Sequence, residues 1–340
     1  MKLPSTMRAL IVDDFHTATF RTADIPRPEP TADQVLVQIK ASGVNPLDSK
    51  IRTGKAPHAK PALPAVLGTD LAGIVVAVGQ NVTTFQVGDE VYGLTGGVGG
   101  LQGSLAEFAA VDPDLLAKKP INLTMREAAA LPLVFLTAWE GLVDSARLTL
   151  RDRANVGTDQ KVLILGGAGG VGHIAVQIAK AHGAKVFATA SAAKHDMVQQ
   201  LGAYPIDYRS TSIEQIVQTF TDGQGFDVVY DTVGGATLDD AFEAVCNYGH
   251  VVSSYGWGTH SLLPLSRKAA TYSGVFVLLP LLTGEGRAHH GEILREATQL
   301  AEANQLRPIV DPRHFTFDSA LSAHEAAEQG TAISKIVIDL

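Results

Sequence analysis

Glycines at positions 167, 169 and 172 of this 340-residue chain have the spacing G-x-G-x-x-G. They follow the apolar run Val162–Leu165, and an amphipathic stretch separates them from a second apolar run, Ala184–Ala190. In a strand–turn–helix unit of this kind, glycines let the backbone approach a pyrophosphate, and the first helical N–H groups bind it. The pattern therefore predicts a dinucleotide site. Its predicted residues are Gly167, Ala168, Gly169, Gly170, Val171 and Gly172.

The end of the second apolar run indicates which dinucleotide binds. Sites for NAD usually place an Asp or Glu about 20 residues after the glycines, where it accepts from a ribose hydroxyl. This chain instead has Ser191, and Lys194 follows. A hydroxyl and an ammonium can hold a 2′-phosphate, which a carboxylate would repel. The segment favours NADPH; the alternative for Lys194 is a solvated residue in the first turn of a helix.

Composition narrows the class of protein. Apolar residues make up 46% of the chain and charged residues 18%, which is typical of a globular protein long enough for two domains. A net charge of −8 argues against a nucleic-acid partner. The longest apolar run, Val275–Leu282, is too short to span a membrane, and no signal peptide is recognisable, so we expect a cytoplasmic protein. The single cysteine excludes an internal disulfide and a four-cysteine zinc site.

The elements that must position these residues follow from the hydrophobic pattern. Short apolar runs broken by Pro, Gly and Asp predict an antiparallel, barrel-like β domain in the first 130 or so residues. These runs are Met7–Val12, Gln34–Ala41, Gly73–Val78, Glu90–Gly93 and Leu105–Val111. Beyond residue 160, alternating strands and helices predict a doubly wound parallel α/β sheet. Its strands are expected at Lys161–Leu165, Lys185–Ala190, Tyr204–Asp207, Asp227–Asp231, His250–Tyr255 and Thr271–Leu278, and helices at Ser212–Thr221, Leu238–Ala244 and Gly291–Ala303.

Several blocks, taken in order, resemble the medium-chain dehydrogenase/reductase superfamily, and within it the zinc-free quinone oxidoreductase (zeta-crystallin-like) branch. The blocks are Ala41–Gly54, Leu67–Gly73, Val87–Tyr92, Gly103–Phe108, Leu136–Trp139 and Gly167–Gly172. The resemblance implies a GroES-like β-barrel catalytic domain over residues 1–130, completed by residues 305–340. It also implies a Rossmann NADPH-binding domain over residues 131–304.

This sequence departs from the zinc-dependent members at the metal ligands. Those enzymes have a cysteine where this chain has Asn45, and Gly-His-Glu where it has Gly68-Thr69-Asp70. A threonine hydroxyl does not replace an imidazole as a zinc ligand. We therefore expect no catalytic metal.

The resemblance places Asn45 and Thr137 beside the nicotinamide ring. Asn45 would either donate from its amide to a substrate oxygen or brace its loop. Thr137 would touch the substrate or the ribose of the cofactor, or cap the helix at whose start it is expected. Lys50 stands where many relatives have a tyrosine; it would stabilise a developing enolate or give a proton, or simply be exposed. The proton donor stays open.

Further cofactor contacts are implied by the resemblance. Ser191, Lys194 and Tyr208 would bind the 2′-phosphate. Residues at the ends of later strands would lie beside the riboses and the carboxamide of the cofactor. One lysine would lie near the returning C-terminal strand. These are Thr232, Val233, Ser254, Tyr255, Val275, Val277 and Lys335.

Together these features predict an NADPH-dependent reductase that transfers hydride to a quinone or an α,β-unsaturated carbonyl. Alternatives are an enoyl-thioester reductase, a metal-free alcohol dehydrogenase-like enzyme, and an NADPH-binding redox sensor or structural protein without turnover. The run Val275–Leu279 is also a candidate edge strand through which a homodimer would join two sheets.

Overall fold

The computed structural model describes residues 3–148 and 160–340 of the chain. It divides into two units, the first comprising Met1–Leu133 with Leu278–Leu340 and the second Val134–Val277. The helix α10 (Arg287–Glu302) therefore groups with the first unit, whereas the sequence boundary at residue 304 assigned it to the nucleotide-binding domain. Tyr92 explains this grouping, because its hydroxyl donates to the carbonyl of Leu294 in α10 at 2.7 Å.

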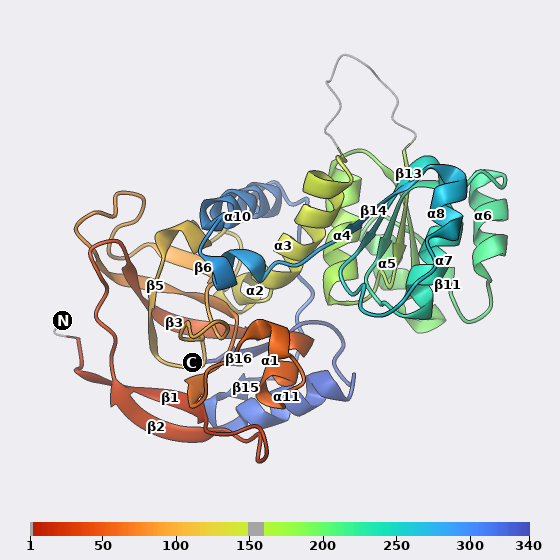
Figure 1. Ribbon diagram of the computed structural model, residues 1–340. Coiled ribbons are helices and arrows are strands. Elements are labelled where there is room, and N and C mark those ends of the chain that lie inside the picture. Colours follow the sequence, from red (N-terminus) through yellow and green to blue (C-terminus); the bar gives the residue numbers. More distant parts are fainter. Residues whose placement is uncertain (1–2, 149–159) are drawn as a thin grey trace. The chain divides into compact units, whose positions relative to one another are not determined.

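The first unit is built on a seven-stranded sheet in the order β15-β16-β3-β5-β6-β8, with β7 also paired to β3 (Figure 1). A second sheet has the order β2-β1-β4. All pairs are antiparallel except β15 with β16. The strands are β1 (Thr6–Val12), β2 (Arg21–Pro26), β3 (Val35–Val44), β4 (Ala65–Val66), β5 (Asp70–Val78), β6 (Glu90–Leu94), β7 (Phe108–Val111), β8 (Leu116–Lys118), β15 (Phe315–Thr316) and β16 (Ile336–Asp339).

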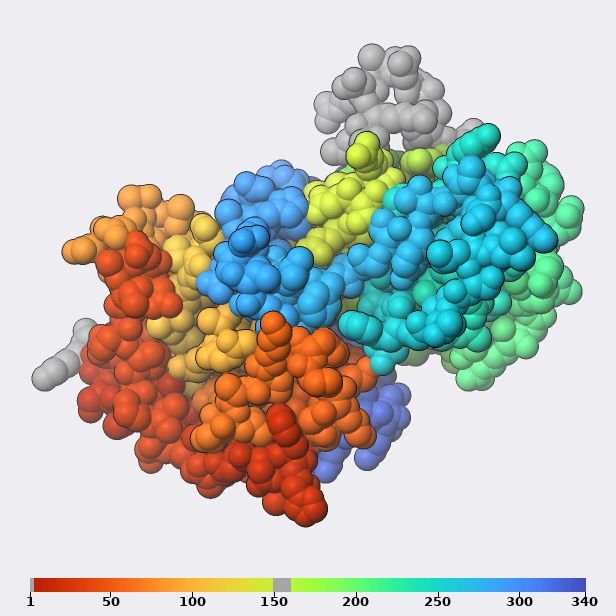
Figure 2. Space-filling view, viewed as in Figure 1, coloured from red at the N-terminus to blue at the C-terminus, as the bar shows by residue number. Residues whose placement is uncertain are grey.

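The helices of this unit are short apart from α10. They are α1 (Pro46–Arg52), α2 (Met125–Ala129), α9 (Leu279–Thr283), α10 and α11 (Ala320–Glu328), with 3₁₀ turns η1 (Pro57–Ala59), η2 (Pro113–Leu115) and η5 (Phe317–Ser319). The C-terminal strand β16 pairs with β3, so the end of the chain completes the N-terminal sheet, as expected. Figure 2 shows these blue C-terminal residues against the orange N-terminal ones.

The second unit holds a six-stranded, fully parallel sheet in the order β11-β10-β9-β12-β13-β14. Counted along the chain this order is 3-2-1-4-5-6, which is that of a dinucleotide-binding sheet. The strands are β9 (Lys161–Leu165), β10 (Lys185–Ala190), β11 (Tyr204–Asp207), β12 (Phe226–Asp231), β13 (Val245–Ser253) and β14 (Thr271–Gly274). The predicted GroES-like plus Rossmann architecture is confirmed. Because the strand order reverses at β9, the ligand crevice is expected at the carboxyl ends of β9, β10 and β12.

Helices cover both faces of this parallel sheet, and its strands β9, β10 and β12 are buried over most of their length. They are α3 (Pro132–Trp139), which crosses the unit boundary, α4 (Gly170–Ala181), α5 (His195–Gln200), α6 (Ile213–Thr221), α7 (Ala236–Ala244) and α8 (Leu263–Lys268), with η3 (Glu140–Ser145), a π-helical turn, and η4 (Ala192–Lys194). Side chains of α6, α7 and α8 form one core with the strands, through Ile216, Phe242 and Leu265. Helix α6 begins at a capping box in which Ser212 and Gln215 satisfy each other's N–H groups.

The sequence was wrong about the last strand. A single strand was expected over Thr271–Leu278, but β14 ends at Gly274 and Leu279 begins helix α9. Pro280 lies in the first turn of α9, where its missing N–H costs no hydrogen bond. A short apolar run does not distinguish strand from helix by its periodicity. The edge strand proposed for a homodimer over Val275–Leu279 therefore does not form in this structure.

Candidate functional site

The glycine turn between β9 and α4 is closely packed against its own backbone. A Cβ at Gly172 would lie 2.1 Å from the carbonyl oxygen of Gly166, and one at Gly167 would lie 2.5 Å from the Cβ of Ala188 in β10. Side chains at these two positions would push the turn away from helix α4 and strand β10. Glycine is therefore required at both positions for the helix and the strand to approach this closely.

Hydrogen bonds hold the turn in place. The N–H of Gly166 donates to the hydroxyl of Thr189 and the N–H of Gly167 to the carbonyl of Thr189, both at 2.9 Å. Helix α4 then begins at Gly170, and His173 donates to the carbonyl of Gly169 at 3.0 Å. The N–H groups that precede this bond belong to the first helical turn. They lie at the positive end of the dipole of this 12-residue helix. The turn is shaped to bind a phosphate.

Ser191 and Tyr208 leave the sheet side by side. Strands β10 and β11 are parallel with Ala190 opposite Asp207, so the next residue of each strand emerges at the same edge. Lys194 follows in η4, and the backbone N–H of Lys194 donates to the carbonyl of Ser191 at 2.8 Å.

Sequence analysis missed Arg209. Its guanidinium lies 5.7 Å from the centre of the Tyr208 ring, which is 55% exposed. A second cation at this edge is suited to a phosphate. The signal in the sequence was an arginine directly after a strand-ending Asp-Tyr pair.

Asp231, at the end of β12, ties together two loops that carry predicted cofactor residues. Its buried carboxylate accepts from the N–H groups of Val233 and Gly234 at 3.0 Å and from the Ser253 hydroxyl at 2.8 Å. The Ser253 hydroxyl oxygen in turn accepts from the N–H of Tyr255 at 3.1 Å. One carboxylate thus holds the loop with Thr232 and Val233 and the loop with Ser254 and Tyr255. From the sequence, Asp231 was predicted only as the last residue of a strand.

The remaining predicted residues of the second unit lie near the same strand ends. Val275 directly follows β14, and its N–H donates to the carbonyl of Ser253 at 3.0 Å, while Val277 is buried. Thr137 lies inside α3, five residues after the first helical residue, so the expectation that it caps the start of this helix was wrong. Its carbonyl accepts from the Tyr230 hydroxyl at 2.6 Å.

A buried polar cluster forms in the first unit, at the end of β3 and the start of β5. We call Asn45, Asp48, Thr69, Asp70 and Lys335 the Asn45 cluster; each of the five is less than 5% exposed. The sheet register brings its members together, because Gly43 pairs with Asp70 and Val44 with Ile336.

The amide of Asn45 is engaged on both sides. Its Nδ2 donates to Asp70 Oδ2 at 2.9 Å and to Thr69 Oγ1 at 3.1 Å. Its Oδ1 accepts from the ammonium of Lys335, which also donates to the carbonyl of Val44 at 3.2 Å. Both hydrogens of the Asn45 amide are therefore directed at protein acceptors.

Two carboxyl groups share the cluster with one ammonium. Asp70 Oδ2 lies 3.7 Å from Lys335 Nζ, and Asp70 Oδ1 accepts from the N–H of Leu133 at 2.9 Å. Asp48 Oδ2 accepts from the N–H of Asn45 at 2.7 Å, whereas Asp48 Oδ1 is buried with no hydrogen-bond partner among the described residues.

Burial in this cluster shifts the pKa values of Asp48, Asp70 and Lys335. Burial, aided by the charge of Asp70, raises the pKa of Asp48 to about 7. Burial also raises the pKa of Asp70, against the opposing effect of Lys335, and it lowers the pKa of Lys335, against the two carboxylates. Desolvation favours the neutral form of each group, so the cluster is best described as a Lys335–Asp70 ion pair beside an aspartate that holds a proton near neutral pH.

Lys50 lies on α1, the helix that begins directly after Asn45. The side chain of Lys50 is half-buried. On other faces of α1, Ser49 contacts His324 of α11 and Arg52 forms an ion pair with Glu328. Helix α1 is thus held at its start by the Asn45 cluster and along its length by α11.

The donor set of the Asn45 cluster does not fit zinc. Zinc sites in proteins use cysteine, histidine and carboxylate ligands, whereas this cluster offers an amide, a hydroxyl, the Asp70 carboxylate already paired with an ammonium, and the Asp48 carboxyl bonded to the N–H of Asn45. Within residues 3–148 and 160–340, no group of three or more His, Cys, Asp or Glu side chains is placed to hold a metal ion.

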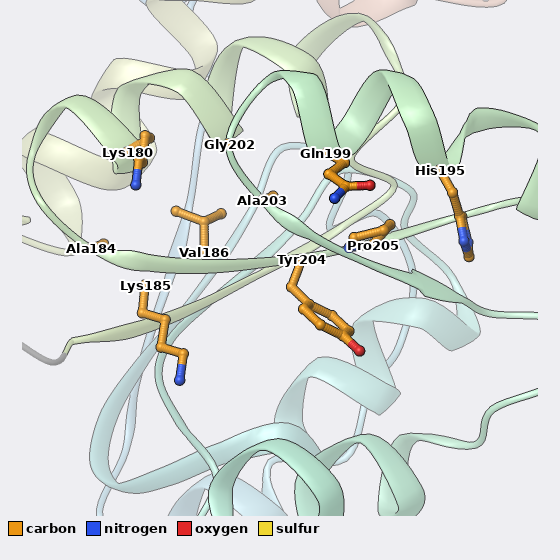
Figure 3. A pocket seen from close by; sticks show the side chains of 10 residues that line it. All are labelled: Lys180, Ala184, Lys185, Val186, His195, Gln199, Gly202, Ala203, Tyr204 and Pro205. Atoms are coloured by element: carbon orange, nitrogen blue, oxygen red, sulfur yellow. The ribbon is translucent and has the colours of Figure 1, made fainter.

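A surface pocket of about 620 Å³ lies at the edge of the parallel sheet and contains none of the predicted site residues (Figure 3). Lys180 and Gln199 reach it from the helices on one face, while Lys185 and Tyr204 point to the opposite face. The pocket wraps around the edge strand β11 and does not converge on a single centre. It therefore gives no reason to move the candidate site from the strand ends.

None of the described helices is long and apolar enough to cross a membrane.

Two family models match parts of this chain. Residues 31–121 match the alcohol dehydrogenase GroES-like domain, and residues 201–338 match the zinc-binding dehydrogenase family. The chain is 36% identical to a 2-methylene-furan-3-one reductase of Solanum lycopersicum, with 99% of this chain and 80% of that protein covered. It is 35% identical, at the same coverage, to a chloroplastic NADPH-dependent alkenal/one oxidoreductase of Arabidopsis thaliana.

A solved structure is closer in sequence. The chain is 55% identical to an alcohol dehydrogenase superfamily protein from Novosphingobium aromaticivorans, with a TM-score of 0.93 over 98% of this chain and 99% of that one. Its similarity over nearly the whole chain to these reductases makes this protein an oxidoreductase that uses NAD(P)H. The protein belongs to the medium-chain dehydrogenase/reductase superfamily, in its quinone-oxidoreductase-like branch.

Proposed function

We propose that this protein is a zinc-independent, NADPH-dependent reductase that transfers hydride to an α,β-unsaturated carbonyl or a quinone. The observation that carries the proposal is the Lys335 ammonium bonded to the Asn45 amide and paired with Asp70. A metal ion bound to these groups would have to displace a buried cation that already satisfies them. Polarisation of the acceptor must then come from hydrogen bonds and side-chain charge.

The second unit binds the cofactor in this proposal. The N–H groups of residues 168–172 hold the pyrophosphate, and Ser191, Lys194 and Tyr208, joined by Arg209, hold the 2′-phosphate. The loops braced by Asp231 line the riboses, and Val275 and Val277 flank the carboxamide. Bound NADPH supplies the hydride; the protein contributes binding and orientation.

The first unit acts on the acceptor. Because both hydrogens of the Asn45 amide are directed at Thr69 and Asp70, we assign Asn45 to bracing its loop and not to donating to the substrate. Lys50 is then our candidate for holding the negative charge that develops on the acceptor oxygen, or for giving a proton to the enolate. Thr137 is assigned to the substrate or to the ribose of the cofactor.

An acceptor panel tests this function against the alternatives. Purified protein is mixed with NADPH and, in turn, with enals, enones, quinones, enoyl thioesters and simple ketones, and NADPH consumption is followed with and without a chelator. We expect chelator-resistant turnover of enals, enones or quinones; unsaturated carbonyl compounds are the acceptors in the names of the two relatives described above. Turnover confined to enoyl thioesters or ketones supports the other reductase assignments, and tight NADPH binding without turnover supports a redox sensor.

Three further expectations belong to this proposal. We propose a homodimer, although its interface is not the strand first expected. We also propose a cytoplasmic location, and we propose that small molecules, not nucleic acids, are its partners, in keeping with the net charge of −8.

A further inference from the structure

Lys335 is immobilised at both its side chain and its backbone. Its ammonium donates to the Val44 carbonyl and to Asn45 Oδ1, and it lies 3.7 Å from the Asp70 carboxylate as an ion pair. Its backbone N–H donates to Ile309 at 3.1 Å, and its carbonyl accepts from Asp311 at 2.7 Å. The residue is 4% exposed. A buried ammonium that donates to two acceptors and is paired with a carboxylate holds those groups in fixed positions.

The orientation of the Asn45 amide depends on this ammonium. An ammonium only donates and a carboxylate only accepts, so Oδ1 must face Lys335 and Nδ2 must face Asp70. The reversed amide would set N–H groups against the ammonium and the carbonyl oxygen against the carboxylate. Lys335 and Asp70 together therefore allow one of the two amide orientations.

The backbone of Asn45 is the entry to α1. Its N–H donates to Asp48 in the first turn of this helix, and Pro46 begins the helix directly afterwards. The N–H of Asp48 in turn donates to the backbone carbonyl of Asn45 at 3.0 Å. The start of α1, four residues before Lys50, is therefore anchored through Asn45.

We propose that Lys335 is a positioning residue, whose ammonium fixes the Asn45 amide and thereby the start of the helix that carries Lys50. The inference rests on the proposed function, in which Lys50 acts on the acceptor. Lys335 itself touches neither acceptor nor cofactor in this account, which replaces its first assignment to the cofactor site.

The charge balance of the cluster supports this role. Without Lys335, two buried carboxyl groups would face each other with no cation among the contacts described for them, and Asp70 could stay buried only by taking up a proton. A protonated Asp70 can donate as well as accept, so the single orientation of the Asn45 amide would be lost.

Lys119 offers a matched control. It is a buried lysine of the same unit, and its ammonium donates to the carbonyls of Pro120 at 3.0 Å and Leu123 at 2.5 Å and pairs with Glu90 at 3.1 Å. Lys119→Met should destabilise the fold in the same manner as Lys335→Met, without touching Asn45.

The test is a double-mutant cycle on the full-length protein. Lys335→Met, Asn45→Ala, their combination and Lys119→Met are compared by urea unfolding, by NADPH affinity, and by kcat and KM for a reducible enone. We expect Lys335→Met to lower kcat by about tenfold with NADPH affinity within about twofold of wild type. We expect the double variant to be no slower than the slower single variant, because both remove the same anchor.

Two results would overturn the proposal: kcat of Lys335→Met matching that of Lys119→Met, or effects of Asn45→Ala and Lys335→Met on kcat that multiply. If Lys335→Met does not fold, the comparison is made between Asp70→Asn and Asp70→Asn/Lys335→Met, where no unpaired buried carboxylate remains at position 70. If the wild type reduces no acceptor, the proposed function fails. The double-mutant cycle measured by unfolding still reports whether Asn45 and Lys335 are coupled. Additive effects of the two substitutions on the free energy of unfolding would then overturn the proposed contact between Lys335 and Asn45.

Discussion

Replacing Gly172 by alanine should weaken NADPH binding, because the new side chain would open the turn that holds the pyrophosphate. The new Cβ would lie 2.1 Å from the Gly166 carbonyl oxygen, where an ordinary contact is 3.4 Å or more. The turn and helix α4 must therefore separate by more than 1 Å (3.4 Å less 2.1 Å). Overpacking of this kind costs about 1–3 kcal/mol. If the turn opens to relieve it and the N–H groups leave the pyrophosphate, NADPH affinity falls by roughly 5- to 150-fold.

Gly183→Ala provides the matched control at the other end of the same helix. Gly183 has φ +82°, and a Cβ there would meet nothing within 4 Å. Alanine at this position costs about 1–2 kcal/mol of stability through its backbone conformation alone. Fluorescence titration with NADPH should show wild-type affinity for Gly183→Ala and weakened affinity for Gly172→Ala. Equal affinities in the two variants would refute the assignment of the pyrophosphate to this turn.

Other perturbations test separate parts of the account. Lys194→Ala should raise KM for NADPH and leave KM for NADH unchanged; an equal effect on both would remove the 2′-phosphate from this residue. Because the pKa of Asp48, about 7, exceeds the ordinary 3.8, the folded state holds an extra proton between these values and the wild type loses stability as pH rises from about 4 to 7. Asp48→Asn should remove about 3 kcal/mol of that loss between pH 5 and pH 8, measured by urea unfolding at the two pH values, and parallel pH profiles would contradict the raised pKa. Elemental analysis should find well under one zinc per chain; one tightly held zinc would contradict the metal-free proposal.

The local pattern was enough to predict most of the fold. In the second unit, β9, β10, β11 and β12 were expected within one residue of their positions, because parallel strands buried on both faces are apolar and are separated by helix signals. Strand β13 begins at Val245, five residues before its expected start, and β14 merges into an apolar run that becomes helix α9 after Gly274. There the sequence pattern is the same for both structures, and only tertiary contacts decide between them.

The sequence predicted the part of the candidate site whose residues are adjacent in the chain, and not the part that depends on tertiary contacts. Residues of the glycine turn are adjacent in sequence, so their spacing alone indicates their chemistry. The contact between Asn45 and Lys335 joins residues 290 positions apart, and it arises from the register of β16 against β3. Register between distant strands is not visible in a single sequence. Asp231 was missed because its role is to hold backbone N–H groups, which no motif records.

The most direct test of the central claim follows the hydride itself. An enone is reduced with NADPH that carries deuterium at the transferable position of the nicotinamide, and the product is examined by NMR. The account predicts deuterium on the β-carbon, with the carbonyl intact and no zinc in the active protein. Deuterium on the carbonyl carbon would make the protein an alcohol dehydrogenase-like enzyme, and NADPH left unoxidised by enones and quinones alike would contradict the reductase assignment altogether.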